Sequence, residues 1–135
     1  MSFVQWSPEL DVGDPKMNAQ HQRLIDIINR FHDVLQQQAP LPELVAVFTE
    51  VVDFAKEHFR DEETLMQAHG YPGLDEHLEI HHRFVARVTE LLLQLRSGQR
   101  QVAADALNFL TDWLTDHIKG TDRQYRPYVA PDPGP

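Results

Sequence analysis

The chain has 135 residues, of which 41% are apolar, and this is enough for one domain with one hydrophobic core. Its 12 Lys and Arg against 21 Asp and Glu give a formal net charge of −9, which disfavours nucleic acid and anionic lipid as partners. There is no cysteine, which excludes iron–sulfur clusters, disulfides, thiol nucleophiles and thiolate metal sites, so any metal must be bound through nitrogen and oxygen.

The first eighteen residues are expected to form an N-terminal arm that lies over the rest of the protein. Residues 1–20 contain no basic segment followed by an apolar one, so no secretory signal is predicted. No stretch has the length and apolarity of a membrane span, and the expectation is a cytoplasmic protein. Residues 1–135 are interpreted as a single domain, with residues 131–135, rich in proline, as a frayed tail.

The first two helices are predicted over residues 19–38 and 42–69. In both segments the apolar residues recur at steps of three and four, which is the pattern of an amphipathic helix. In the second segment, Pro42 suits a first helical position and Gly70 suits a C-terminal stop. The two segments are separated by a short proline-containing loop.

The last two helices are predicted over residues 74–96 and 101–119, and both show the same periodicity. No segment of the chain alternates with period two, so no strand is predicted. Long helices joined by short loops favour antiparallel neighbours. The fold class predicted from the sequence is therefore all-α, an up-down-up-down antiparallel four-helix bundle.

Polar groups occupy the faces of these helices that must point inward. Burying an ionised carboxylate or several imidazoles without partners is costly, and metal ions would satisfy all of them together. In an antiparallel bundle, the starts of the first and third helices lie beside the ends of the second and fourth, so these groups converge at one end. The set is His21 in the first helix, His58 and Glu62 in the second, His77 and His81 in the third, and His117 in the fourth.

The spacing within the set also fits metal binding. The pairs in the second and third helices are each four residues apart, which places both side chains of a pair on one helix face. Asp122 is a less regular candidate, because it follows His117 by five residues and would lie about 140° away on a straight helix. We infer that the helix loosens or stops near Gly120, so that Asp122 can turn back towards the site.

Three further histidines are predicted to be structural or surface residues. A single inward histidine is more often a hydrogen-bonded core residue than a ligand. His82 lies about 100° round the helix from His81, and His32 lies some three turns from His21. His69 is in the last turn before the predicted helix stop.

With these residues in view, the sequence resembles the hemerythrin family, specifically its single-domain bacterial members, over nearly the whole chain. One departure is Asn18, where the family more often has Asp, and we interpret Asn18 as the cap of the first helix. The motifs that carry the resemblance are Trp6, the run from Met17 to Leu24, the run from His58 to Glu63 with Met66, Gly70-Tyr71-Pro72, His77 and His81, and His117 with Asp122 ahead of Tyr125.

The resemblance implies two iron ions per chain with an oxo or hydroxo bridge. The implied ligands are His77, His81 and His117 on one iron, His21 and His58 on the other, and Glu62 and Asp122 as bridges between them. The first iron is then six-coordinate and the second five-coordinate. Only the second iron has a vacancy, and dioxygen is expected to bind there.

The resemblance further implies an apolar pocket over the vacancy, because water or a general acid would help to release peroxide and leave both irons ferric. The expected function is reversible dioxygen binding for storage, transport or delivery, with no enzymatic reaction. We expect a monomer, with dioxygen as ligand and an oxygen-consuming enzyme as a candidate partner. The implied pocket residues are Leu24, Phe59, Trp113, Leu114 and Ile118.

Other metal-dependent functions fit the sequence less well or remain as alternatives. A di-iron enzyme of the ferritin or oxygenase type would be carboxylate-rich and would use Glu-x-x-His from two helices, whereas only Glu79-Ile80-His81-His82 matches here. A zinc hydrolase is disfavoured because there is no His-Glu-x-x-His and seven ligands exceed the needs of one zinc. An oxygen or redox sensor, and peroxidase or nitric oxide activity, stay as alternatives.

Overall fold

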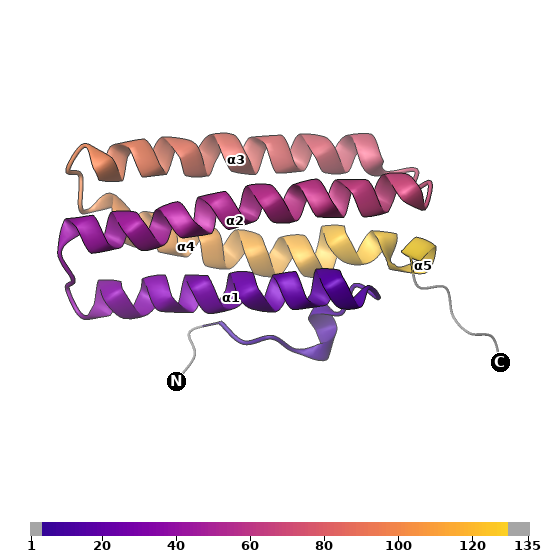
Figure 1. The fold of residues 1–135 in the computed structure, drawn as a ribbon, viewed down its shortest axis with the longest axis horizontal. Coiled ribbons are helices and arrows are strands. Elements are labelled where there is room, and N and C mark those ends of the chain that lie inside the picture. Colours follow the sequence, from indigo (N-terminus) through magenta and orange to yellow (C-terminus); the bar gives the residue numbers. More distant parts are fainter. Residues whose placement is uncertain (1–3, 130–135) are drawn as a thin grey trace.

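The computed structural model describes residues 4–129, which are all-α and contain no strand. Four long helices, α1 (Pro15–Gln36), α2 (Leu41–Ala68), α3 (Leu74–Arg96) and α4 (Val102–Asp116), run alternately up and down (Figure 1). Helices α1 and α3 each pack against both α2 and α4, so the four helices close around one core. The predicted four-helix bundle is confirmed, and α3 begins and ends at the predicted residues.

Short elements flank the bundle. The N-terminal arm contains a 3-10 turn, η1 (Pro8–Leu10), and runs beside α1 (Figure 1). The chain continues from α4 without a loop through a π-helical turn, η2 (His117–Thr121), a 3-10 turn, η3 (Asp122–Tyr125), and a last turn, α5 (Arg126–Val129). Residues 131–135, predicted to be a frayed tail, lie outside the described residues.

The arm is attached to the bundle through Asn29 of α1. The Asn29 side chain accepts a hydrogen bond from the Val4 amide at 2.6 Å and donates one to the Val4 carbonyl at 2.8 Å. Lys119, which follows α4, forms an ion pair with Glu9 of the arm at 2.9 Å. The described residues of the arm that precede α1, residues 4–14, therefore lie against the bundle.

The start of α1 differs from the prediction. Helix α1 begins at Pro15, and the carboxylate of Asp14 caps it by accepting a hydrogen bond from the Met17 amide at 3.0 Å. Proline is suited to the first helical position because its missing N–H is not needed there. The interpretation of Asn18 as the cap is wrong. Its side chain instead accepts from the Val12 amide at 3.0 Å and so anchors the arm.

Helices α1, α2 and α3 end in the same way, with a residue of positive φ just after the helix. These residues are Gln38 (φ 54°), Gly70 (φ 64°) and Gly98 (φ 99°). In each case the next amide bonds back five residues, as from Tyr71 to Met66 at 3.0 Å, which is the pattern of a Schellman motif. Of these three residues, Gln38 alone is not a glycine, so its backbone adopts the left-handed conformation despite its Cβ atom.

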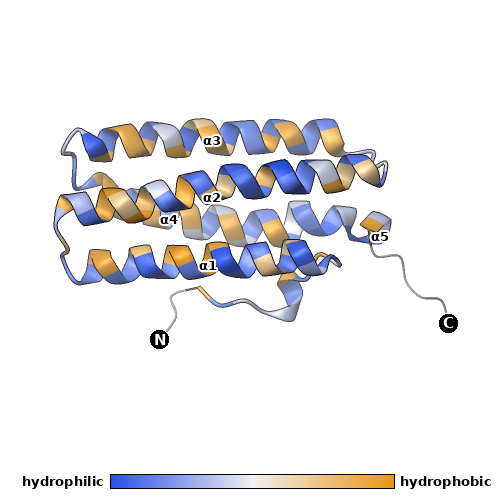
Figure 2. Ribbon diagram, in the orientation of Figure 1, coloured by the Kyte–Doolittle hydropathy of each residue, from blue (hydrophilic) through white to orange (hydrophobic). Residues whose placement is uncertain are grey.

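The core lies between the helices, and its residues come from the inward stripe of each. Figure 2 shows apolar and polar positions alternating along all four helices, as expected for amphipathic packing. No helix in residues 4–129 is long and apolar enough to cross a membrane. The largest fully buried side chains include Tyr125, Phe31, Phe48, Met17, Ile27 and Ile28.

Candidate metal centre

Seven charged or histidine side chains are buried in the bundle, and within residues 4–129 no other such side chain is buried. They lie at the end of the molecule where α1 and α3 begin, where α2 ends and where α4 runs into η2 (Figure 1). None is more than 5% exposed. The structure thus brings together all seven candidate ligands named from the sequence: His21, His58, Glu62, His77, His81, His117 and Asp122.

The potential ligand atoms fall into two groups that share both carboxylates. One group contains three histidines and the other contains two, and within each group the atoms lie within 4.8 Å of one another. The imidazole rings of a group are also neighbours, since the His21 and His58 centroids are 4.6 Å apart and those of His77 and His81 are 4.5 Å apart. The first group is Glu62, His77, His81, His117 and Asp122, and the second is His21, His58, Glu62 and Asp122.

Each carboxylate presents one oxygen to each group. Glu62 Oε1 lies 3.0 Å from His81 Nε2, whereas its Oε2 lies 3.4 Å from His58 Nε2. Asp122 Oδ1 lies 2.8 Å from His117 Nε2, whereas its Oδ2 lies 3.3 Å from His21 Nε2. This is the arrangement that two carboxylates need in order to span two adjacent cations.

Asp122 reaches the centre because the helix widens after α4. In η2 the Asp122 amide bonds to the His117 carbonyl, five residues back, as in a π-helix. A turn closed by an i to i−5 bond places residues five apart on about the same face, which an α-helix does not. The predicted loosening of the helix near Gly120 is present. Helical turns continue past Gly120 through η2 and η3, so the helix does not stop there. Gly120 has no positive φ, so the widening does not depend on glycine conformation.

The polar atoms of this cluster are close together but poorly aligned for hydrogen bonding. His77 Nε2 and Asp122 Oδ1 are 2.8 Å apart, yet neither atom has a hydrogen bond of acceptable geometry. The same holds for His117 Nε2 and His81 Nε2. Buried polar atoms are rarely left unsatisfied in folded proteins. These nitrogens and oxygens lie close together without bonding to one another. Cations bound between them would satisfy all of them.

Without metal, the charges in the cluster stabilise one another. Burial by itself lowers the pKa of His21, but the close carboxylates of Asp122 and Glu62 outweigh it and raise the pKa from 6.5 to about 9. The pKa of His77 is also raised to about 9 by the same balance. Burial raises the pKa of Glu62, but His58, His21 and His77 together lower it well below its usual value. The carboxylates are therefore ionised and available as ligands.

Three residues outside the predicted set hold the candidate ligands in place. Gln20 lies with its Oε1 2.6 Å from His58 Nδ1, and the carboxylate of Glu63 lies 2.9 Å from His81 Nδ1. Such partners orient an imidazole so that its Nε2 faces the metal. The role of Gln20 and Glu63 was not predicted from the sequence, because each contacts a histidine on a neighbouring helix and neither lies on an apolar stripe.

Tyr125 is the third such residue. Its fully buried hydroxyl donates a hydrogen bond to Glu62 Oε2 at 3.0 Å. Burial and the nearby Glu62 and Asp122 charges raise the pKa of Tyr125 far above its usual value, so the phenol keeps its proton. From the sequence, Tyr125 was noted only as part of the motif that follows Asp122, and its contact with Glu62 was not predicted.

Aromatic rings cover the three-histidine group. Phe59 stacks on His81 with centroids 3.8 Å apart, and Trp113 stacks on His117 at 4.1 Å. Phe59 also lies 5.8 Å from His58, and its ring is 5.7 Å from that of Trp113. Phe59 is therefore the ring that links Trp113 to His58 of the two-histidine group. Three other residues predicted for the pocket are buried in the core: Leu24, Leu114 and Ile118.

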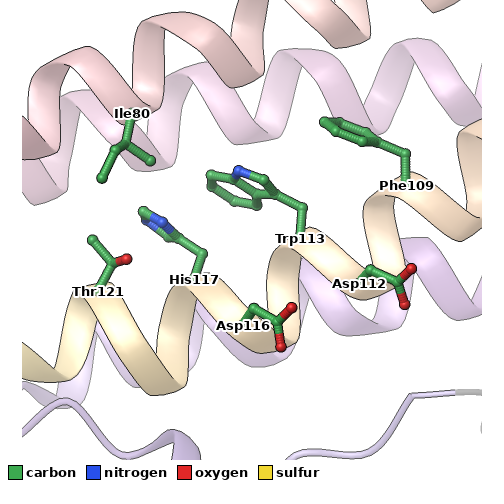
Figure 3. A pocket seen from close by; sticks show the side chains of 7 residues that line it. All are labelled: Ile80, Phe109, Asp112, Trp113, Asp116, His117 and Thr121. Atoms are coloured by element: carbon green, nitrogen blue, oxygen red, sulfur yellow. The ribbon is translucent and has the colours of Figure 1, made fainter.

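Trp113 also faces a groove at the surface. The groove has a volume of about 410 Å³ and lies over α4 and η2, with Ile80 of α3 on its other side (Figure 3). The indole of Trp113 and the imidazole of His117 lie next to each other along it, while Asp112 and Asp116 stand at its edge. One candidate ligand, His117, therefore lines this groove together with Trp113.

The other three histidines are outside the cluster. His69 and His82 are exposed. His32 is partly buried, and its Nδ1 lies 3.4 Å from the Asp33 carboxylate. None of the three belongs to either of the two ligand groups.

Comparisons with known proteins show what the whole chain is similar to. The family model described as the hemerythrin HHE cation binding domain matches residues 12–129. The bacteriohemerythrin of Stenotrophomonas maltophilia is 33% identical over 96% of this chain and 83% of its own length. That of Methylococcus capsulatus is 31% identical over 96% of this chain and 99% of its own.

Solved structures show the same similarity. A wild-type hemerythrin crystal structure has a TM-score of 0.88 and 27% identity, covering 95% of this chain and 98% of that one. A leucine-to-tyrosine mutant of hemerythrin has a TM-score of 0.89, also at 27% identity, over 96% of this chain and 99% of that chain. These values show that the similarity extends over the whole bundle and is not confined to the ligand motifs.

Proposed function

The chain belongs to the hemerythrin family, and from this premise we propose that it binds dioxygen reversibly at a non-haem centre of two iron ions. The proposal treats the chain as one hemerythrin-like domain. Storage, transport or delivery of dioxygen to an oxygen-consuming enzyme are the roles that such binding would serve. The observation that supports it most directly is the way each carboxylate offers one oxygen to each histidine group.

The proposed ligand assignment follows the two groups. One iron would be held by His77, His81 and His117, and the other by His21 and His58. Glu62 and Asp122 would be shared between the two ions, together with an oxo or hydroxo group. Imidazole nitrogen and carboxylate oxygen are ligands that suit iron, and when bound it supplies the electrons for reversible oxygen binding. The two-histidine side has one ligand fewer, so dioxygen is proposed to bind there.

The protein's own contribution is to keep this vacancy dry. All seven candidate ligands are at most 5% exposed, and Phe59 is 4% exposed. Exclusion of water and of titratable acids from the vacancy favours release of intact dioxygen. The pocket proposed to do this is lined by Leu24, Phe59, Trp113, Leu114 and Ile118.

The deciding experiment is anaerobic loading with ferrous iron followed by exposure to dioxygen. We expect two ferrous ions per chain and a visible charge-transfer band that appears with dioxygen and disappears when dioxygen is removed. His58→Ala removes a ligand of the two-histidine group and should abolish the band. His82→Ala, an exposed histidine on α3, is the matched control and should behave as wild type. Irreversible oxidation of the wild type would instead favour a di-iron enzyme.

Trp113 provides a separate test of the pocket. Trp113→Glu places a carboxyl group against Phe59 and His117, where it can supply protons and admit water. We predict much faster oxidation of the oxygen-bound protein to the ferric form, measured as decay of the visible band. Trp113→Phe keeps the site apolar and should stay close to wild type. Equal decay rates for Trp113→Glu and wild type would refute the pocket assignment.

A further inference from the structure

All three tyrosines of the chain lie in one line that begins at the metal centre. Tyr125 donates its hydrogen bond to Glu62, and its ring centroid is 6.2 Å from that of Tyr71. Tyr71 in turn lies 5.2 Å from Tyr128. Exposure increases along the line, since Tyr125 is fully buried, Tyr71 is partly buried and Tyr128 is 44% exposed.

The position of the middle ring is set by the loop between α2 and α3. A Cβ atom on Gly73 would lie 2.7 Å from the Tyr71 hydroxyl oxygen, which is closer than real contacts allow. Only glycine therefore lets the Tyr71 ring fold over this loop in its present place. The function proposed above uses neither the Gly70-Tyr71-Pro72-Gly73 loop nor Tyr128.

The inner end of the line is joined to the ligand cluster by a hydrogen bond. Tyr125 is bonded to Glu62 Oε2, the oxygen that faces the two-histidine group. Oxidation of a tyrosine removes its phenolic proton together with one electron, and the hydrogen bond to Glu62 is the contact that joins Tyr125 to the cluster. Phenylalanine in the same place could not take part, because it has no such proton and is far harder to oxidise.

We propose that Tyr125, Tyr71 and Tyr128 form a one-electron path that carries oxidising equivalents from the metal centre to the protein surface during reaction with hydrogen peroxide. This inference rests on the proposed di-iron site. It adds a peroxide-consuming activity that needs an external one-electron reductant, of the ascorbate or phenol class, at Tyr128.

The chemistry balances with the tyrosines as electron donors. Reduction of hydrogen peroxide to two waters breaks the O–O bond and takes two electrons and two protons. A ferrous pair supplies both electrons itself, but a ferric pair does not. In the ferric protein, two phenols each lose one electron and one proton, so that one peroxide and two tyrosines give two waters and two tyrosyl radicals. The external reductant then returns one electron and one proton to each radical.

The test traps the radicals in the ferric, iron-loaded full chain. The protein is mixed with hydrogen peroxide and a nitroso spin trap, and the labelled residue is found by peptide mass spectrometry. We expect the label on Tyr128, together with dityrosine-linked dimers formed by coupling of two exposed Tyr128 radicals. Metal-free protein treated in the same way should show neither product.

Two variants test the order of the path. Tyr71→Phe keeps the ring but removes the phenol, and it should abolish both the Tyr128 label and the dimers, because the fully buried Tyr125 is out of reach of the trap. Tyr128→Phe alters an exposed ring and should move the label inward to Tyr71. If Tyr71→Phe leaves Tyr128 labelled as in wild type, freely diffusing oxidants reach it directly and the path is refuted. Label on Trp113 in place of the tyrosines would also refute it.

The same preparation separates this inference from the function on which it rests. Iron content and the reversible visible band are measured before peroxide is added. A chain that shows the band but no tyrosyl label refutes the path alone. A chain that takes up no iron refutes both the path and the di-iron site.

Discussion

The two histidine groups differ in the residue that supports them from outside. His81 is bonded to the carboxylate of Glu63, whereas His58 is bonded to the amide of Gln20. Gln20 is in turn held by Asp61, to which its Nε2 donates at 2.8 Å. A carboxylate makes its imidazole a stronger electron donor than an amide does. The three-histidine side is thus the more electron-rich of the two proposed iron positions.

Replacing this carboxylate should weaken metal binding. Glu63→Gln keeps the size of the side chain but removes its charge, and loss of such a partner lowers metal affinity by about 10- to 100-fold. Iron affinity is measured by competition with a chelator. Glu57→Gln makes the same change at an exposed position of α2 and should have no effect. Equal affinities for the two variants would show that Glu63 does not support the site.

The metal-free protein should lose stability as the pH rises through the weakly alkaline range. His21 and His77 have folded-state pKa values of about 9, above the ordinary 6.5, because Asp122 and Glu62 favour their charged forms. A raised histidine pKa stabilises the fold fully below about pH 6.5, and this stability is lost as the pH rises from there through 9. Urea unfolding at several pH values measures it.

Asp122→Asn is the control for this pH dependence. Among the interactions that raise the two pKa values, the close contact with the Asp122 carboxylate is the largest for both histidines. The variant should therefore flatten the dependence between pH 6.5 and 9. A slope equal to that of the metal-free wild type would contradict the assigned cause.

The ends of the helices show how local chemistry positions the site. Gly70 allows α2 to stop just where α3 must turn back, so that His58 and His77 meet at the same end. At the other end of the chain, η2 widens the helix and turns Asp122 inward. The end of α2 depends on a glycine with positive φ, whereas the widened turn η2 contains no residue with positive φ.

The end of α1 offers a stabilising substitution. Gln38 has φ 54°, a conformation that costs free energy for any residue with a Cβ atom. Gln38→Gly should raise the free energy of unfolding by about 0.5–1 kcal/mol, after allowing for the greater freedom of glycine in the unfolded chain. Gln37→Gly, at φ −78°, should lower it instead. Urea denaturation compares the two, and a loss of stability in Gln38→Gly would contradict the argument.

At the scale of the whole molecule, the centre joins every long helix of the bundle. Helices α1, α2 and α3 supply ligands, and the segment that continues α4 supplies His117 and Asp122. The described arm is tied both to α1 through Asn29 and to this last segment through Lys119. A change in metal occupancy should therefore be felt across the fold and not only near the ligands.

Metal removal tests this coupling. A ligand present at about a thousand times its dissociation constant stabilises the fold by roughly 4 kcal/mol. For a domain of this size that corresponds to a fall in Tm of roughly 10–15 °C on removal. Differential scanning calorimetry of iron-loaded and chelator-treated protein measures the change, with His82→Ala as a control that should show the same difference. Identical Tm values with and without iron would count against the site.

Most of the bundle and the set of candidate ligands could be predicted from local pattern. The three- and four-residue periodicity places His58 and Glu62 on one face of α2 whatever else the chain does. Glycine and proline mark the helix ends because their backbone preferences act locally. The prediction was wrong at Asn18, where Asp14 and Pro15 together made a better start for the helix.

The amino-acid sequence by itself determined the four helices, their antiparallel order and the convergence of five histidines and a glutamate at one end, because these follow from periodicity along one chain. Only the tertiary structure decided how each helix is rotated against its neighbours. That rotation brings Gln20 to His58, Glu63 to His81 and Tyr125 to Glu62. Such contacts join residues 18 to 63 positions apart, and no local pattern encodes them.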